Sequence, residues 1–312
     1  IDAEILYNRY DVFKTLFEYY MYASTLMFLL LILQIFKDRS RYLNISIKVF
    51  KFTILGLFAL HTLGLIVRWY ISGHAPWSDA YESMIYVAWA TMAFGVMLGI
   101  KSDLTFASTA FVTAMILMIA HWNWMDPSIG NLQPVLDSYW LMIHVAIIVG
   151  SYGPFTLGMI LGLITLLLMI LTTSKNKDKM ALNIKELTII NEMALTVGLV
   201  MLTIGNFLGG MWANESWGRY WGWDPKETWA LISIMIYAFV IHMRLIPGLR
   251  SRFGFSVASV VAFGSIMMTY FGVNFYLAGL HSYAKDDQEI SITYIATALI
   301  IITLLSVFAY RK

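Results

Sequence analysis

The stretch YWLMIHVAIIVGSYGPFTLGMILGLITLLLMILT, residues 139–172, contains no Asp, Glu, Lys or Arg. A helix that crosses the hydrocarbon core of a bilayer needs about 20 apolar residues. This stretch exceeds that length, so it predicts a membrane-spanning helix that tilts or extends beyond the bilayer. It places the chain among membrane proteins.

Further runs of comparable hydrophobicity lie on both sides of this helix, at 16–36, 49–71, 81–100, 104–121, 187–211, 225–246, 255–276 and 290–309. The chain is 59% hydrophobic and 13% charged, whereas soluble domains average about 45–50% apolar and about 25% charged residues. We therefore expect an all-α polytopic membrane protein with about nine transmembrane helices. This composition excludes the soluble enzyme classes, and the lack of any Cys excludes disulfides and thiolate metal sites.

Basic side chains are unevenly divided between the two ends of these spans. One end would carry fifteen of the 21 Lys and Arg, namely Lys37, Arg39, Arg41, Lys48, Lys51, Lys101, Lys175, Lys177, Lys179, Lys185, Arg244, Arg250, Arg252, Arg311 and Lys312. The other end would carry the remaining six, namely Arg9, Lys14, Arg68, Arg219, Lys226 and Lys285. Because cytoplasmic loops hold the excess of Lys and Arg, the N-terminus is predicted outside and the C-terminus in the cytoplasm. Residues 1–15 then form a polar lead-in on the outer side, and residues 16–312 form a single transmembrane domain.

Tryptophan is concentrated on the outer side of the predicted bundle. Trp89 lies inside the third span. The other ten map to the outer half or the outer loops, namely Trp69, Trp77, Trp122, Trp124, Trp140, Trp212, Trp217, Trp221, Trp223 and Trp229. Aromatic belts usually form at both membrane interfaces. The one-sided pattern therefore indicates an outer surface that receives a large, flat, apolar ligand.

The six His are divided in the same way. The outer side has four of them, namely His74, His121, His144 and His281. His61 lies about ten residues inside its span, or roughly 15 Å deep at 1.5 Å per residue, and His242 lies near the cytoplasmic end of the seventh span. A lone His is often hydrogen-bonded packing, whereas ionisable residues inside the membrane are commonly functional. The four outer His beside a Trp-rich loop favour a ligand role, although His61, His74 and His121 receive no assigned role.

The segment WGRYWGWDPKETW, residues 217–229, combines a helix start with an aromatic cluster. Asp224 is a suitable N-cap, Pro225 suits the first helical position, and Glu227 completes a capping box. Asp79 and Glu82 form a similar pair before the third span. These acidic residues are therefore predicted to start helices, whatever else they do.

Capping does not explain the first half of this segment. Three Trp and one Tyr fall within seven residues and are interrupted by two Gly, the aromatic residues being Trp217, Tyr220, Trp221 and Trp223. They form a flat apolar surface that backbone can approach closely. Arg219 and Lys226 flank it and could pair with carboxylates, as a macrocycle with two propionates would require. Haem iron takes axial His ligands, and His144 and His281, on either side of this loop in the sequence, could converge over it.

Several stretches resemble one family of membrane proteins. WGRYWGWDPKETWALI (217–232), HTLGLIVRWYISGHAPWSDAYES (61–83) and FYLAGLHSY (275–283) are similar to the CcsA/ResC-type cytochrome c biogenesis proteins. These belong to a haem-handling family with a tryptophan-rich (WWD) signature. The contexts of His144 and His242 are similar as well. The resemblance implies a haem-handling domain over 16–312 with a WWD-type outer loop at 212–229.

The resemblance also implies roles for single residues. His144 and His281 correspond to the two external His that ligate haem b at the outer active site. His242 corresponds to the transmembrane His of this half, whose partner ligand comes from a CcsB/ResB-type subunit or fused half. The opening polar segment looks like the junction in fused CcsB–CcsA synthetases.

The implied activity is that of a cytochrome c haem lyase, or synthetase. It attaches exported haem to the CXXCH thiols of apocytochrome c at the outer face of the bacterial plasma membrane. The resemblance implies no nucleic-acid partner.

Two alternatives remain open at this stage. A haem-binding electron-transfer cytochrome would place His pairs at matched depths across the membrane, and no span here carries two His well inside the bilayer. A small-solute transporter would show midplane carboxylates or broken helices, whereas His61 is the strongest midplane ionisable residue. From the residues alone, the firm expectation is a haem or porphyrin site on the outer face.

Overall fold

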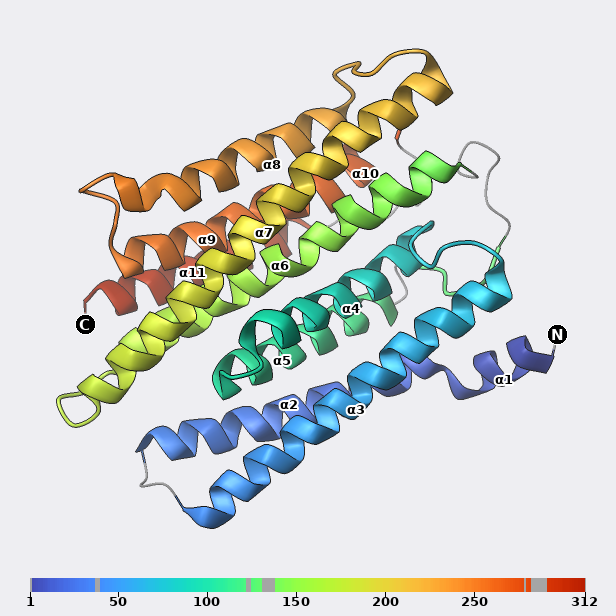
Figure 1. The fold of residues 1–312 in the computed structure, drawn as a ribbon. Coiled ribbons are helices and arrows are strands. Elements are labelled where there is room, and N and C mark those ends of the chain that lie inside the picture. The colour runs from blue at the N-terminus through green and yellow to red at the C-terminus, as the bar shows by residue number, and fades with distance from the viewer. Residues whose placement is uncertain are drawn as a thin grey trace.

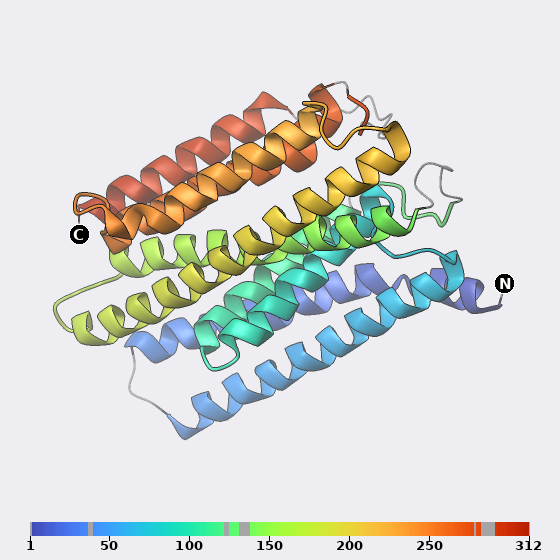
Figure 2. The ribbon, with the colours of Figure 1, turned by 45° about the horizontal axis from the view of Figure 1, so that its top comes forward.

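The computed structural model describes residues 2–36, 40–121, 125–130, 138–277, 279–281 and 291–311. Within these ranges the chain is helical, with no strand: α1 (Asp2–Tyr10), α2 (Val12–Phe36), α3 (Arg41–Ser72), α4 (Ala80–Gly99), α5 (Asp103–His121), α6 (Tyr139–Ile170), α7 (Lys177–Trp217), α8 (Pro225–His242), η2 (Met243–Leu245), α9 (Arg252–Met267), η3 (Met268–Gly272), α10 (Val273–Tyr276) and α11 (Ile292–Tyr310). Figure 1 shows one bundle, with α1–α5 on one side, α8, α9 and α11 on the other, and α6 and α7 between them. The turned view in Figure 2 shows the same order.

Nine helices in the described ranges are long and apolar enough to cross a membrane, and each expected span falls on one of them. This confirms the predicted all-α polytopic fold. Figure 1 places the two termini at opposite ends of the bundle, as an odd number of spans requires. Which end faces the cytoplasm remains a prediction from the Lys and Arg distribution. Some residues used for that prediction or for the tryptophan pattern lie outside the described residues, namely Lys37, Arg39, Trp122, Trp124, Lys285 and Lys312.

The polar N-terminal segment, for which the sequence predicts no secondary structure, is helical. Residues Asp2–Tyr10 form α1, and Asp11, with a φ of 39°, separates this helix from α2. The ring of Tyr7 packs edge to face against Phe13 at 6.4 Å between centroids, which holds α1 against the start of α2. Hydropathy marks where a helix is apolar, not where it begins, so the predicted start at residue 16 was late.

Helix α7 extends beyond its apolar run at both ends. The prediction covered 187–211, whereas the helix runs from Lys177 to Trp217. Gly218 follows as the C-cap, and its φ of 71° lies in the left-handed region that glycine adopts without a steric penalty. The last turns of α7 therefore lie at the same end of the bundle as the Trp-rich segment.

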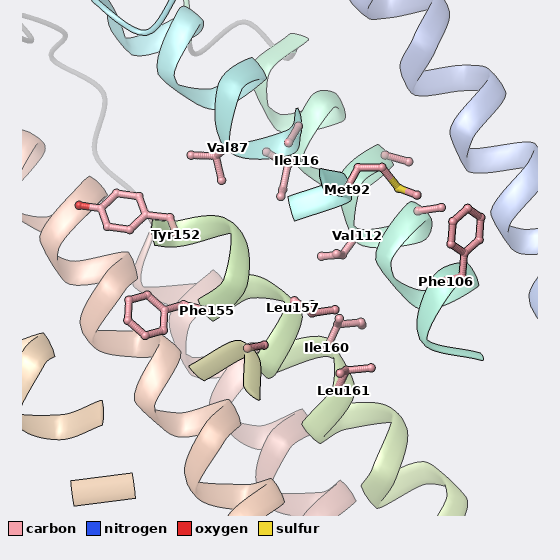
Figure 3. Close-up of a cluster of buried hydrophobic side chains, with 14 of the residues drawn as sticks. Val87, Met92, Phe106, Val112, Ile116, Tyr152, Phe155, Leu157, Ile160 and Leu161 are labelled. Carbon is pink, nitrogen blue, oxygen red and sulfur yellow. The ribbon is translucent and has the colours of Figure 1, made fainter. Parts of the chain in front are cut away.

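The core lies where α4, α5 and α6 pack together. Figure 3 shows side chains from these helices in one apolar cluster, namely Val87, Met92, Phe106, Val112, Ile116, Tyr152, Phe155, Leu157, Ile160 and Leu161. Gly153 lets α6 approach α4 closely, because a Cβ there would lie 2.7 Å from the backbone carbonyl carbon of Ala90. This close contact joins the middle of α6 to the middle of α4.

Candidate functional site

A cavity of about 400 Å³ lies at the end of the bundle that carries the N-terminus. The first turns of α4, α6 and α8, the last turns of α7 and the π-helical turn η3 form its wall. Its volume falls in the range of small-molecule and cofactor sites, roughly 300–1,000 Å³. The lining is largely apolar and aromatic, and it also contains the cation Lys226 and both His144 and His281. The two outer His singled out from the sequence therefore meet at one cavity.

His144 reaches the cavity from the second turn of α6, where its side chain is buried. Its Nδ1 lies 2.8 Å from the backbone carbonyl oxygen of Trp140, one helical turn earlier. A carbonyl oxygen can only accept, so Nδ1 carries the proton and Nε2 keeps its lone pair. In this tautomer Nε2 can bind a metal centre.

His281 has the same arrangement from a different part of the chain. Its Nδ1 lies 2.9 Å from Oδ1 of Asp224, which accepts a hydrogen bond from Nδ1–H, so that Nε2 keeps its lone pair in the neutral imidazole. The backbone N–H of Leu280 donates to the other oxygen of Asp224 at 2.7 Å. A carboxylate bonded to the far nitrogen of a His is the usual outer partner of a metal-ligating imidazole.

Asp224 also starts helix α8, as the sequence predicts. Its Oδ1 accepts from the backbone N–H of Lys226 at 2.9 Å. Oε2 of Glu227 accepts from the backbone N–H groups of Asp224 at 3.2 Å and Gly222 at 2.8 Å, so the capping box is formed. Burial raises the pKa of the Asp224 carboxyl, but the hydrogen bonds from His281 and from the backbone N–H groups of Lys226 and Leu280 lower it to about 2. Asp224 is therefore an anion throughout the physiological pH range.

The predicted aromatic surface divides into three environments. Trp221 lines the cavity. Trp217 does not, but it packs edge to face on His281 with 4.9 Å between ring centroids. Trp223 has a φ of 57°, is 70% exposed, and touches the site through an edge contact with Trp221. The three Trp therefore form a graded series from the cavity wall to the surface and not one flat platform.

The two flanking cations also differ. Lys226 lines the cavity, and its Nζ donates to Oδ1 of Asn274 at 2.7 Å. The guanidinium of Arg219 lies against Gly222, and Arg219 is not among the residues that line the cavity. Of the two, Lys226 is placed to meet a carboxylate inside the cavity.

Sequence reasoning gave Trp212 no role in the site beyond its outer location. This residue of α7 is fully buried and lines the cavity, and its ring contacts both His144 and His281. Gly209, one turn earlier on α7, also lines the cavity and faces the imidazole of His144, where a Cβ would lie in ordinary van der Waals contact at 3.4 Å from Cδ2. The spacing of Gly209 and Trp212 on one helix face is the signal that could have identified it.

A second feature that the sequence did not predict is a buried ion pair beside the cavity. Nε of Arg68 lies 2.8 Å from Oε1 of Glu82, and both side chains are at most 1% exposed. Arg68 also donates to the carbonyl oxygens of Pro127 and Ser128, which ties the segment after α5 to the start of α4.

Asp79 caps α4 by accepting from the N–H of Glu82 at 2.7 Å, as predicted. Asp79 lines the cavity, and burial together with the charge of Glu82 raises the pKa of Asp79 to about 6.

The remaining His lie away from the cavity. His242, at the far end of α8, is exposed, and its Nδ1 donates to the carbonyl oxygen of Ala238 at 2.7 Å. His61 is fully buried, with Nε2 3.1 Å from the carbonyl oxygen of Ile85. His121 lies 3.8 Å from Asp11, and His74 lies 3.6 Å from Glu82. In the described ranges no three His, Asp or Glu side chains are grouped to hold a bare metal ion.

The chain is similar in sequence to proteins of one known family. The sequence model of the family described as "Cytochrome C assembly protein" matches residues 77–281, which include the whole cavity wall. The chain is 48% identical over 292 residues to Protein NrfI of Wolinella succinogenes, where the match covers 92% of this chain but only 32% of NrfI.

Two further relatives are matched over most of their own length. The cytochrome c biogenesis protein CcsA of Prochlorococcus marinus (strain MIT 9301) is 34% identical over 72% of this chain and 81% of its own length. The protein of that name from Marchantia polymorpha is 32% identical over 82% of this chain and 94% of its own length. Such membership supports a role in haem handling and cytochrome c maturation. The chain belongs to the cytochrome c assembly protein family and is a CcsA-type member of it.

Proposed function

We propose that the cavity holds haem b between the Nε2 atoms of His144 and His281, and that the protein attaches this haem to apocytochrome c. One observation carries the proposal. Two His from distant parts of the chain line the same cavity, and each has its Nδ1 bonded to an acceptor, so that Nε2 keeps its lone pair. Packing alone would not require the same tautomer at both positions.

The rest of the cavity wall suits the other parts of a haem. Trp221 and Trp212 offer aromatic surface for the macrocycle, and Lys226 offers a cation for a propionate. Asp224 orients His281, and Trp217 packs against the ring of His281. Trp223 and Arg219 lie further out, where they could contact an arriving apocytochrome.

The chemistry of attachment is the addition of a thiol across a vinyl group. Each cysteine sulfur of a CXXCH segment forms a C–S bond with one vinyl group, and the thiol proton ends on the adjacent vinyl carbon. This chain has no Cys, so both thiols come from the apocytochrome. Its own residues would bind the haem and orient it, with His144 and His281 as ligands of the iron.

The proposal extends to location and partners. The cavity end of the bundle has the fewer Lys and Arg, so we place it on the outer face of a bacterial plasma membrane. Exposed His242 at the opposite end would share a second haem with a ligand from a CcsB/ResB-type subunit or fused half, and so lie on the path that brings haem outward.

A maturation assay tests the proposed activity. Cells that depend on this protein, with its partner present, are given His144→Gly or His281→Gly together with a reporter cytochrome c. Either replacement should abolish covalent haem in the reporter, and added imidazole should restore part of it by entering the vacated ligand position. If both variants mature the reporter normally, the proposal is wrong. An electron-transfer cytochrome would lose electron transfer in such variants but leave reporter maturation intact.

A further inference from the structure

We infer that Trp212 is a positioning residue that sets the ring planes of His144 and His281 together. The inference rests on the proposed haem site and goes beyond it, because it assigns the coupling of the two axial ligands to one side chain of α7.

The contacts of Trp212 carry the argument. The centroid of its ring lies 5.3 Å from that of His144, with 31° between the planes, and 5.7 Å from that of His281, with 51° between the planes. Trp217 packs edge to face on Trp212 at 4.7 Å and on His281 at 4.9 Å, which closes a three-ring cluster. One indole therefore connects imidazoles that come from α6 and from the segment after α10.

These contacts complement the hydrogen bonds at the far edges of the imidazoles. The carbonyl oxygen of Trp140 and the carboxylate of Asp224 fix where each Nδ1 points. A single hydrogen bond still lets a ring turn about the axis of that bond, and turning moves Nε2 off the iron axis. Contact with the indole opposes this rotation in both rings, because each would lose packing against a fully buried neighbour.

The indole N–H adds an independent observation. Nε1 of Trp212 is buried and has no acceptor among the described residues. Leaving a buried donor unpaired costs about 1–3 kcal/mol, a cost that Phe or Leu at this position would avoid. Trp at this position is therefore poorly explained by stability alone and is explained by the large ring surface that reaches both imidazoles.

The test compares two variants of Trp212 with a matched interior tryptophan. Trp212→Phe keeps an aromatic ring and removes the unpaired N–H, whereas Trp212→Leu removes the ring. Trp89→Leu is the control, because Trp89 lies in the bundle away from the cavity lining and its N–H is paired with Thr62 Oγ1 at 2.9 Å. The protein is purified from membranes with its partner, thermal unfolding verifies the fold, and the bound haem b is followed by absorption, by electron paramagnetic resonance and by its rate of transfer to apomyoglobin.

We expect Trp212→Leu to lose the six-coordinate low-spin signal and to release haem about tenfold faster or more, the range seen when outer partners of metal ligands are removed. Added imidazole should restore the low-spin signal, Trp212→Phe should be intermediate, and Trp89→Leu should match wild type. A low-spin signal and release rate unchanged in Trp212→Leu would overturn the inference, as would equal loss in Trp89→Leu. Failure of the haem site itself is seen separately, as wild-type spectra in His144→Gly and His281→Gly.

Discussion

Single residues at the cavity combine two tasks, and Asp224 is the clearest example. Its carboxylate caps α8 through the N–H of Lys226 and accepts a hydrogen bond from Nδ1–H of His281. The same carboxylate also accepts from the N–H of Leu280, which brings the segment after α10 to the start of α8. A local helix-start residue thereby becomes the link that carries His281 to the cavity.

Replacing Asp224 should separate these two tasks. Asn is as good an N-cap as Asp, so Asp224→Asn should keep α8 intact but offer His281 a neutral acceptor. We expect haem to be released about tenfold faster in Asp224→Asn. Asp224→Ala should release haem faster still and lose about 1 kcal/mol more stability than Asp224→Asn, through the missing cap. Transfer of haem to apomyoglobin measures the rates, and equal rates in wild type and both variants would refute the link.

The charge of Asp224 also makes a prediction about pH. A carboxyl whose pKa is depressed from 3.8 to about 2 in the folded protein stabilises the fold above the ordinary pKa, and this contribution is lost as the pH falls toward 2. The stability that wild type holds over Asp224→Asn, up to roughly 2 kcal/mol, should therefore shrink as the pH falls from about 4 toward 2. Detergent unfolding over that pH range measures it. A difference that stays constant from pH 5 down to pH 2 would contradict the assignment.

At the scale of elements, the cavity depends on close packing between helices. α6 lies against α4 at Gly153, and Arg68 of α3 joins Glu82 at the start of α4 to the segment after α5. A buried ion pair of this kind is costly to break, because the remaining charge is left unpaired. The ion pair fixes the first turn of α4, and the contact at Gly153 holds the middle of α6 against the middle of α4. The first turns of both helices line the cavity.

Two glycine substitutions test the packing argument. Gly153→Ala places a Cβ 2.7 Å from backbone carbon of Ala90, so α6 must move away from α4, and we expect a loss of about 1–3 kcal/mol. Gly56→Ala is the matched control, since a Cβ there meets nothing within 4 Å, and alanine should stabilise α3 by about 0.5–1 kcal/mol. Thermal unfolding of both variants provides the measurement. Equal stability of the two would show that the helices do not pack as described.

The sequence predicts these elements better than it predicts their contacts. The predicted spans follow from hydropathy, and the α8 capping box follows from residues within one helical turn. The structure confirms both in the residues that it describes. The bond between His281 and Asp224 joins residues 57 positions apart, and the Arg68–Glu82 pair joins different helices, so no local pattern shows either. Trp223 has a left-handed backbone and is 70% exposed, and hydropathy alone could not predict either feature.

At the scale of the whole molecule, the two ends of the bundle differ in character. One end carries the cavity and most of the tryptophans, and the other carries the majority of Lys and Arg together with exposed His242. We predict that the cavity end faces away from the cytoplasm. Haem would then pass from the neighbourhood of His242 to the cavity across the length of α8.

The lack of cysteine makes this orientation easy to measure. Ser216→Cys places one thiol at the cavity end, and Ser174→Cys places one at the opposite end, and both positions are exposed. In intact spheroplasts a membrane-impermeant maleimide should label residue 216 at once and residue 174 only after permeabilisation. The reverse pattern would invert the topology and place the cavity in the cytoplasm.

The central claim is that His144 and His281 are the two axial ligands of one haem b, and its most direct test is the spectrum of bound haem. The protein purified from membranes should give a b-type pyridine haemochrome and a six-coordinate low-spin spectrum. His144→Gly and His281→Gly should each give a five-coordinate or haem-depleted protein, and imidazole should return both to the low-spin form. Unchanged low-spin haem in either variant, or active wild-type protein without b-type haem, would contradict the account.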